Sequence, residues 1–145
     1  MSNPNALSVA DIDFTSTTEI THETRSYGLD NSHHITSFSN GLTNGYLSNS
    51  YQYTGDNITS GVFIQGRNLE NLTFDYDDKP NPYFGLIMPV AGIEEYLTYN
   101  RNNIIKITYN GIPIEYVYEY NAQGLPTRVA RKDGLGETRF TYESY

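Results

Sequence analysis

The chain has 145 residues, no cysteine and a formal net charge of −8 at pH 7. This length predicts one domain, residues 1–145, that is large enough to bury a hydrophobic core. The missing cysteines exclude disulfides, thiolate catalysis and cysteine metal sites, the acidic balance argues against nucleic-acid binding, and no apolar run reaches the roughly 20 residues of a transmembrane helix.

The first 30 residues give the weakest structural signal. The segment TSTTEITHETRSY (15–27) alternates but offers little apolar surface, so residues 1–30 are predicted to be an edge strand or partly disordered. The segment MSNPNALSVADIDF (1–14) has neither the basic start nor the apolar core of a signal peptide. His33 and His34 follow, but neighbouring strand residues point to opposite faces and do not easily share a zinc ion. A loop is predicted there.

The remainder of the chain has the composition and the turn-forming residues of β-hairpins. Fourteen Tyr, six Phe and no Trp suit pleated, half-buried surfaces. Asn-Gly pairs, whose residues tolerate the positive φ of tight turns, occur at Asn40-Gly41, Asn44-Gly45 and Asn110-Gly111. Further turns are predicted at 55–57, 77–82, 123–124 and 133–136. Between the turns, polar and apolar side chains alternate, as in a sheet with one buried and one wet face.

An aromatic-x-Tyr element recurs along the chain. It begins at Tyr51, Phe74, Tyr118 and Phe140, with gaps of 23, 44 and 22 residues, so one copy is missing midway, near Tyr96. A period of about 22 residues corresponds to one hairpin with its turns. The sequence therefore predicts an all-β fold, an antiparallel meander of repeated hairpins with about eight to ten strands, forming a curved sheet or an open barrel.

The segment PYFGLIMPVAGIEEYLTYN (82–100) departs from this pattern. It is the most apolar part of the chain, and its apolar residues fit helical and strand periods equally well. We expect a packed loop leading into a short helical turn, near residues 82–99, that plugs one end of the sheet.

Three carboxylates lie close together at the end of a predicted strand. Asp75, Asp77 and Asp78 carry oxygen ligands that suit calcium, but no twelve-residue loop ending in Glu follows them. Aspartates in turns commonly bond their own backbone. A turn beginning at Asp77 and Asp78 is therefore the preferred interpretation, and these three residues are only weak metal candidates.

Two pairs of glutamates resemble the paired acids of glycosidases. They are Glu94 with Glu95, and Glu115 with Glu119. Acid catalysis needs one carboxyl in an apolar pocket, whereas Glu115 and Glu119 fall on the polar face of a predicted strand. No base, nucleophile and oxyanion donor can be combined from the sequence, so we expect no enzymatic activity, no metal and no cofactor.

A row of aromatic side chains is the remaining candidate binding surface. The alternation places five rings on one side of neighbouring strands, and these are Tyr116, Tyr118, Tyr120, Phe140 and Tyr142. Exposed tyrosines stack on sugar rings or form protein contacts, but rows of this kind more often form the core of a sheet. We expect a closed or plugged sheet that holds the rings inside; an open sheet would favour glycan or lipid binding.

Three segments carry a resemblance to a known family. FDYDDKPNPYFGL (74–86), NRNNIIKITY (100–109) and YEYNAQGLPTRV (118–129) resemble the C-terminal half of an uncharacterised domain family of Bacteroidetes secreted proteins and lipoproteins with a porin-like fold. The likeness extends over residues 45–145. The Tyr-x-Tyr-Asn-x-x-Gly-x-Pro pattern is also similar to the tyrosine-aspartate repeats of large bacterial surface and toxin proteins.

This resemblance implies a strongly curved all-β sheet, an extracytoplasmic location and no established reaction. It favours a non-enzymatic structural or protein-interaction module of the bacterial cell envelope or extracellular space. The alternative is a ligand-binding module for glycan or lipid that uses the tyrosine-rich face. An envelope protein or a glycan is the expected partner, and the oligomeric state stays open.

Overall fold

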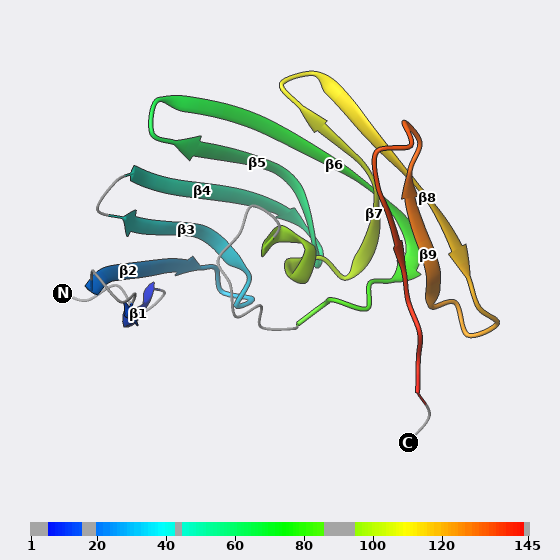
Figure 1. The fold of residues 1–145 in the computed structure, drawn as a ribbon, viewed down its shortest axis with the longest axis horizontal. Coiled ribbons are helices and arrows are strands. Elements are labelled where there is room, and N and C mark those ends of the chain that lie inside the picture. The colour runs from blue at the N-terminus through cyan, green and yellow to red at the C-terminus, as the bar shows by residue number, and fades with distance from the viewer. Residues whose placement is uncertain (1–5, 16–19, 43–44, 86–94, 144–145) are drawn as a thin grey trace. The chain divides into compact units, whose positions relative to one another are not determined.

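A computed structural model describes residues 6–15, 20–42, 45–85 and 95–143 of the chain (Figure 1). The described residues form ten β-strands and one short 3₁₀ helix. In chain order these are β1 Ala6–Thr15, β2 Ile20–Leu29, β3 Ile35–Leu42, β4 Gly45–Thr54, β5 Asn57–Gln65, β6 Asn68–Pro80, η1 Glu95–Tyr99, β7 Asn102–Tyr109, β8 Ile112–Tyr120, β9 Pro126–Arg131 and β10 Glu137–Arg139.

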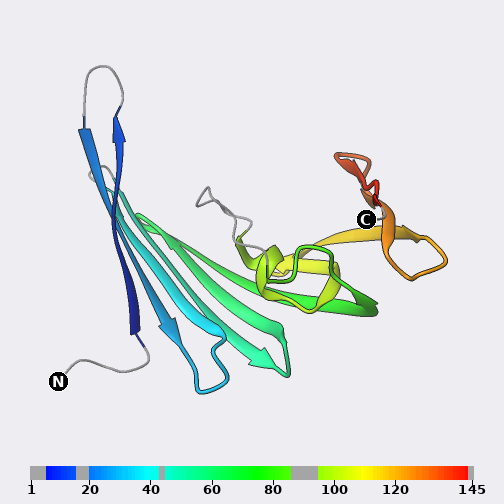
Figure 2. The ribbon, with the colours of Figure 1, turned by 90° about the horizontal axis from the view of Figure 1, so that it is seen from below.

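The strands follow one another in the sheet in the same order as in the sequence, from β1 to β10. Their antiparallel pairing confirms the predicted all-β meander of hairpins. Figure 2 shows β1 and β2 side by side as a long hairpin. At the N-terminal end of the sheet β1 is the edge strand, whereas β2 pairs on both sides. His33 and His34 lie in the loop between β2 and β3, as expected.

The chain divides into two compact units. The N-terminal unit comprises Met1–Gln52 and Ser60–Asn71, and the C-terminal unit comprises Tyr53–Thr59 and Leu72–Tyr145. In the N-terminal unit, Phe38 packs on Tyr27 and Phe63 packs edge-on against Tyr51. The core of the C-terminal unit consists of buried residues from β5, β6, η1 and β7, namely Ile58, Leu72, Phe74, Tyr96, Ile104 and Ile107.

One predicted turn lies within a strand, and another begins later than predicted. Asn110 and Gly111 do form a tight turn, with φ of +47° and +87° as a type I′ turn requires. Asn40 and Gly41, however, lie within β3, where Gly41 pairs with both β2 and β4. The turn predicted at 77–82 begins later than expected, because β6 continues to Pro80 through two irregularities in its pairing with β7, and the turn residues start at Pro82. Pairing on neighbouring strands therefore overrides the local turn signal.

The aromatic-x-Tyr elements occupy alternate strands. Those at Tyr51, Phe74 and Tyr118 lie on β4, β6 and β8, and the one at Phe140 directly follows β10. The expectation that a further hairpin copy of the element belongs near Tyr96 is wrong, because Tyr96 lies on η1 and not on a strand. The gap of 44 residues is one hairpin that contains an insert between β6 and β7. This insert includes the predicted helical turn, whose Tyr96 ring packs 5.4 Å from that of Phe74.

Candidate functional site

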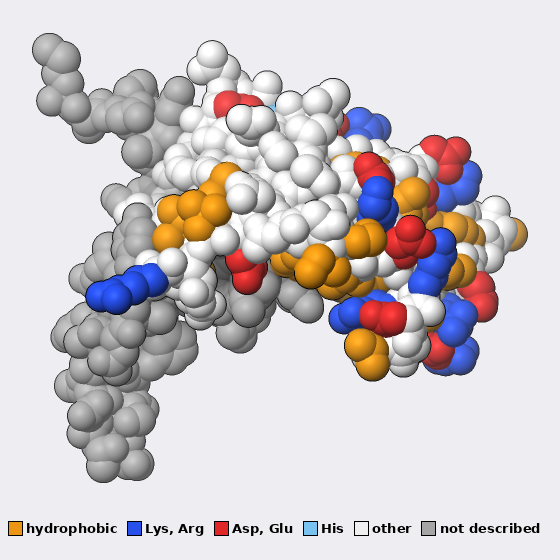
Figure 3. Space-filling view, turned by 90° about the horizontal axis from the view of Figure 1, so that it is seen from above, with side chains coloured by type: hydrophobic (Ala, Val, Ile, Leu, Met, Phe, Trp, Pro, Cys, Tyr) orange, Lys and Arg blue, Asp and Glu red, His pale blue; other side chains and the backbone are white. Residues whose placement is uncertain are grey.

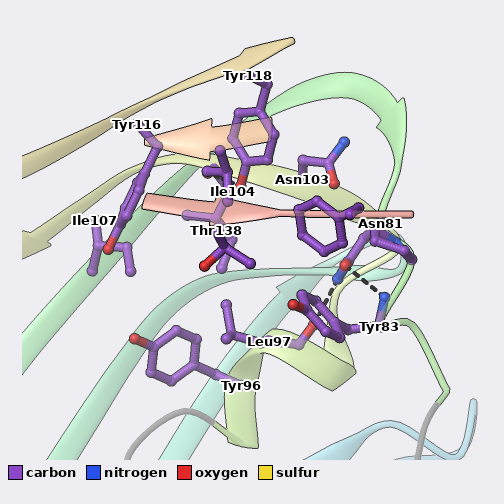
Figure 4. Close-up of a pocket in the computed structure, with 13 residues that line it drawn as sticks. Asn81, Tyr83, Tyr96, Leu97, Asn103, Ile104, Ile107, Tyr116, Tyr118 and Thr138 are labelled. Atoms are coloured by element: carbon purple, nitrogen blue, oxygen red, sulfur yellow. Dashed lines mark hydrogen bonds between the residues drawn. The ribbon is translucent and has the colours of Figure 1, made fainter. Parts of the chain in front are cut away.

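A pocket of about 190 Å³ lies in the C-terminal unit (Figure 4). Five aromatic rings line it: Tyr83 follows β6, Tyr96 belongs to η1, Tyr116 and Tyr118 belong to β8, and Phe140 follows β10. The other lining residues are Asn81, Pro82, Leu97, Asn103, Ile104, Ile107, Val129 and Thr138. Figure 4 shows Thr138 between the β8 tyrosines and the residues of η1.

The two-residue period of β8 turns its tyrosines toward the pocket. Tyr116 and Tyr118 line the pocket, whereas Val117 between them is exposed, as alternation along a strand requires. The Tyr118 hydroxyl donates a 2.9 Å hydrogen bond to the carbonyl of Ile104 on β7. The Tyr118 ring also stacks on Tyr120, with a centroid separation of 5.8 Å and an interplanar angle of 10°. These contacts fix the ring orientations on this strand.

Three of the five predicted binding rings line the pocket, and two do not. Tyr116, Tyr118 and Phe140 line it. Tyr120 instead donates a hydrogen bond to the Asp77 carboxylate. Tyr142 donates a 2.7 Å bond to the carbonyl of Pro126 and is 42% exposed. The other four rings are partly buried.

Sequence reasoning missed Tyr83 and Tyr96 as pocket residues. Both belong to the insert between β6 and β7 and lie outside the alternating rows. The Tyr83 ring lies 5.7 Å from that of Phe140, and the Tyr96 and Tyr109 hydroxyls are 3.1 Å apart. The Pro-flanked aromatic run at residues 82–84 was the available signal, but strand periodicity gives it no partner.

A network of asparagine amides holds the insert against the strands. The fully buried Asn100 side chain accepts hydrogen bonds from the Ile58 N–H and the Tyr76 hydroxyl, both at 2.7 Å. It also donates to the Tyr96 carbonyl at 2.6 Å. Asn81 donates to the carbonyls of Leu97 and Asn100, at 2.6 and 2.7 Å. The sequence signal was the density of asparagines in 100–103.

Burial lowers the acidity of several tyrosines in this unit, and three of them are affected strongly. It raises the pKa of the Tyr76, Tyr118 and Tyr120 hydroxyls above the ordinary value of 10.0. The Asp77 carboxylate adds to the increase at Tyr118 and Tyr120, because a second negative charge beside it disfavours tyrosinate. The three phenols therefore stay protonated in the folded chain at pH values where free tyrosine ionises.

We expect stability to fall as the pH rises above about 10, where the unfolded chain releases tyrosine protons that the folded chain retains. The folded pKa is raised, so the stabilisation is complete below the unfolded pKa and is lost toward the folded one. Urea midpoints measured against pH, with tyrosinate absorbance recorded in parallel, check this. Tyr118→Phe should flatten the decline, and an unchanged midpoint through about pH 11 would contradict it.

The three aspartates that the sequence marked as weak metal candidates each interact with other groups of the protein. Asp75 forms a 2.8 Å ion pair with Lys106, and Asp78 forms one of 3.1 Å with Lys79. The Asp77 carboxylate accepts hydrogen bonds from Tyr120 and, at 2.9 Å, from the Lys79 N–H. Asp77 and Asp78 lie in β6 rather than in a turn. Within the described residues, no three His, Cys, Asp or Glu side chains are grouped as metal ligands would be.

Opposite charges pair across the strands of the C-terminal unit. On β8, Glu115 pairs with Lys132 at 2.5 Å and Glu119 pairs with Arg128 at 2.9 Å. Arg128 also binds Glu137 at 2.7 Å. The Lys132 ammonium holds the pKa of Glu115 below its ordinary value. Figure 3 shows acidic and basic side chains beside one another over this unit.

The other glutamate pair considered from the sequence is Glu94 with Glu95. Glu94 and the side chain of Glu95 lie outside the described residues.

No family model, curated protein or solved structure matches the chain. In the described part of the chain, no helix is long and apolar enough to cross a membrane.

Proposed function

We propose that this chain is a non-enzymatic structural or protein-interaction module of the bacterial cell envelope or extracellular space. The observation that supports this most is that the two faces of β8 carry different groups, with ion-paired side chains on one face and pocket-lining tyrosines on the other. The side chains of Glu115 and Glu119 are engaged in ion pairs with Lys132 and Arg128, while the neighbouring tyrosines line an uncharged pocket. A carboxyl that acts as a general acid needs an apolar surrounding that raises its pKa, whereas the pKa of Glu115 is lowered.

The ion pairs also suit a polar contact surface. Exposed pairs contribute little to stability, typically about 0–1 kcal/mol each, so their value lies in solubility and in the choice of partner. The exposed Val117 side chain lies between Glu115 and Glu119 on β8 and supplies an apolar point of contact there. The extracytoplasmic location rests on the family resemblance of residues 45–145.

The location and the contact can be tested together in the cells that make the protein. We expect a tagged chain to appear in the extracytoplasmic fractions and a photoreactive residue at Val117 to yield a discrete crosslinked adduct. The same residue at Leu69, which is also exposed but lies on β6, serves as the control. A wholly cytoplasmic protein, or equal and diffuse labelling at both positions, would overturn the proposal.

Ligand binding through the tyrosine-rich face is the second candidate function. The observation that favours it is the pocket itself, because Tyr116, Tyr118 and Phe140 converge there with two further rings. Most small-molecule sites are concave and aromatic, with a few polar groups that orient the ligand.

A further inference from the structure

The aromatic pocket is built for a small and uncharged ligand. Its volume of about 190 Å³ is below the roughly 300–1,000 Å³ of sites for drug-sized molecules, so it has room for about one ring. Among the described residues that line it, none carries a formal charge. A charged ligand would lose its hydration there without gaining an opposite charge. Thr138 is exposed and lines the pocket, so a ligand can enter from solvent.

The charges nearby make an anionic ligand less suitable still. The Asp77 carboxylate lies 3.4 Å from the Asn103 amide, which lines the pocket. Asp77 also contributes to the raised pKa of Tyr118, so its field reaches the pocket wall. An acidic sugar or a phosphate would meet this like charge.

The lining combines apolar ring faces with a few polar groups. Aromatic faces favour a ligand with a flat apolar surface. The Thr138 hydroxyl makes no hydrogen bond within the described part of the chain, and the Asn103 amide donates long hydrogen bonds, at 3.3 to 3.5 Å, to the Asp77 carboxylate and the Lys79 carbonyl. The Tyr118 hydroxyl gives its proton to Ile104 and keeps an oxygen that can accept. A ligand with C–H groups on one face and hydroxyls at its edge matches both features.

We infer that this pocket binds one neutral pyranose ring, as a free sugar or as the end of a glycan. The ring's C–H face packs on the aromatic side chains, and its hydroxyls reach Thr138 and Tyr118. An extended lipid chain is a poorer match because the pocket is short. The inference deepens the second candidate function and does not depend on the envelope location, because it concerns the purified chain alone.

Saturation-transfer NMR on the purified full chain tests this with three probes: methyl β-D-galactopyranoside, methyl α-D-glucopyranoside and glucuronic acid. We expect a signal from at least one neutral glycoside, with a dissociation constant of about 1 mM, and none from glucuronic acid. Tyr116→Ala should weaken binding about tenfold, as the loss of one aromatic contact implies. Tyr142→Ala removes a ring outside the pocket and should leave binding unchanged.

Far-ultraviolet circular dichroism of each variant shows whether it has folded. Should Tyr116→Ala fail to fold, the exposed Thr138→Val, which removes one hydroxyl, should still weaken binding. No signal from either neutral glycoside, equal binding of glucuronic acid, or binding that no pocket variant weakens would overturn the inference. Displacement of the sugar by a proline-rich peptide of higher affinity would assign the pocket to a peptide instead. None of these results alters the location test above.

Discussion

Replacement of Leu72 by alanine is expected to destabilise the protein by about 2–5 kcal/mol. Leu72 is 1% exposed on β6, where it lies opposite Tyr109 of β7. Its removal takes away buried apolar surface and leaves a cavity, because the residues around it are held by strand pairing and relax only in part. The change should appear as a lower urea midpoint with an unchanged m-value.

Leu69→Ala provides the matched control for this prediction. Leu69 lies three residues earlier on the same strand and is 55% exposed, so its truncation should change stability by no more than about 0.5 kcal/mol. The two variants have the same chemistry and nearly the same strand position. Equal midpoints for Leu69→Ala and Leu72→Ala would mean that Leu72 is not part of the core.

Asn100→Ala is expected to cost about 2–4 kcal/mol, although it removes a polar side chain. The buried Asn100 side chain accepts from the Ile58 N–H and the Tyr76 hydroxyl and donates to the Tyr96 carbonyl. Alanine leaves the Ile58 N–H and the Tyr96 carbonyl without these bonds in the interior, and an unsatisfied buried group costs more than a hydrogen bond ordinarily contributes. Urea unfolding again provides the measurement.

Asn68→Ala is the control for the amide network. Asn68 is exposed at the start of β6 and makes no side-chain hydrogen bond within the described part of the chain. We expect its replacement to change stability by no more than about 0.5 kcal/mol. If Asn100→Ala were equally mild, water would have to satisfy the Ile58 and Tyr96 groups, and the insert would not depend on this side chain.

Much of the strand architecture could be predicted from the sequence. The alternation in Ile112–Tyr120 marked β8, and Asn110-Gly111 marked its turn. Both signals are local: the pleat sends successive side chains to opposite faces, and few residues adopt the positive φ that a type I′ turn needs. The aromatic-x-Tyr element likewise marked β4, β6 and β8.

The interruptions in this pattern were decided by tertiary structure. Asn40-Gly41 carries the same dipeptide as Asn110-Gly111 but lies within β3, because strands on both sides pair with it. Pro80 still pairs with Asn102 at the end of β6, because the register of the pairing shifts between Tyr76 and Pro80. A local signal is weak when backbone hydrogen bonds to neighbouring strands oppose it.

Local patterns along the chain were enough to predict an all-β meander whose tyrosines share one face of β8. They could not identify which rings form the pocket, because Tyr83 and Tyr96 come from an insert that η1 and the amides of Asn81 and Asn100 hold in place. The physical reason is the range of the interactions. Strand alternation depends on adjacent residues, whereas the bond from Ile58 to Asn100 joins residues 42 positions apart and forms only when both segments are buried together.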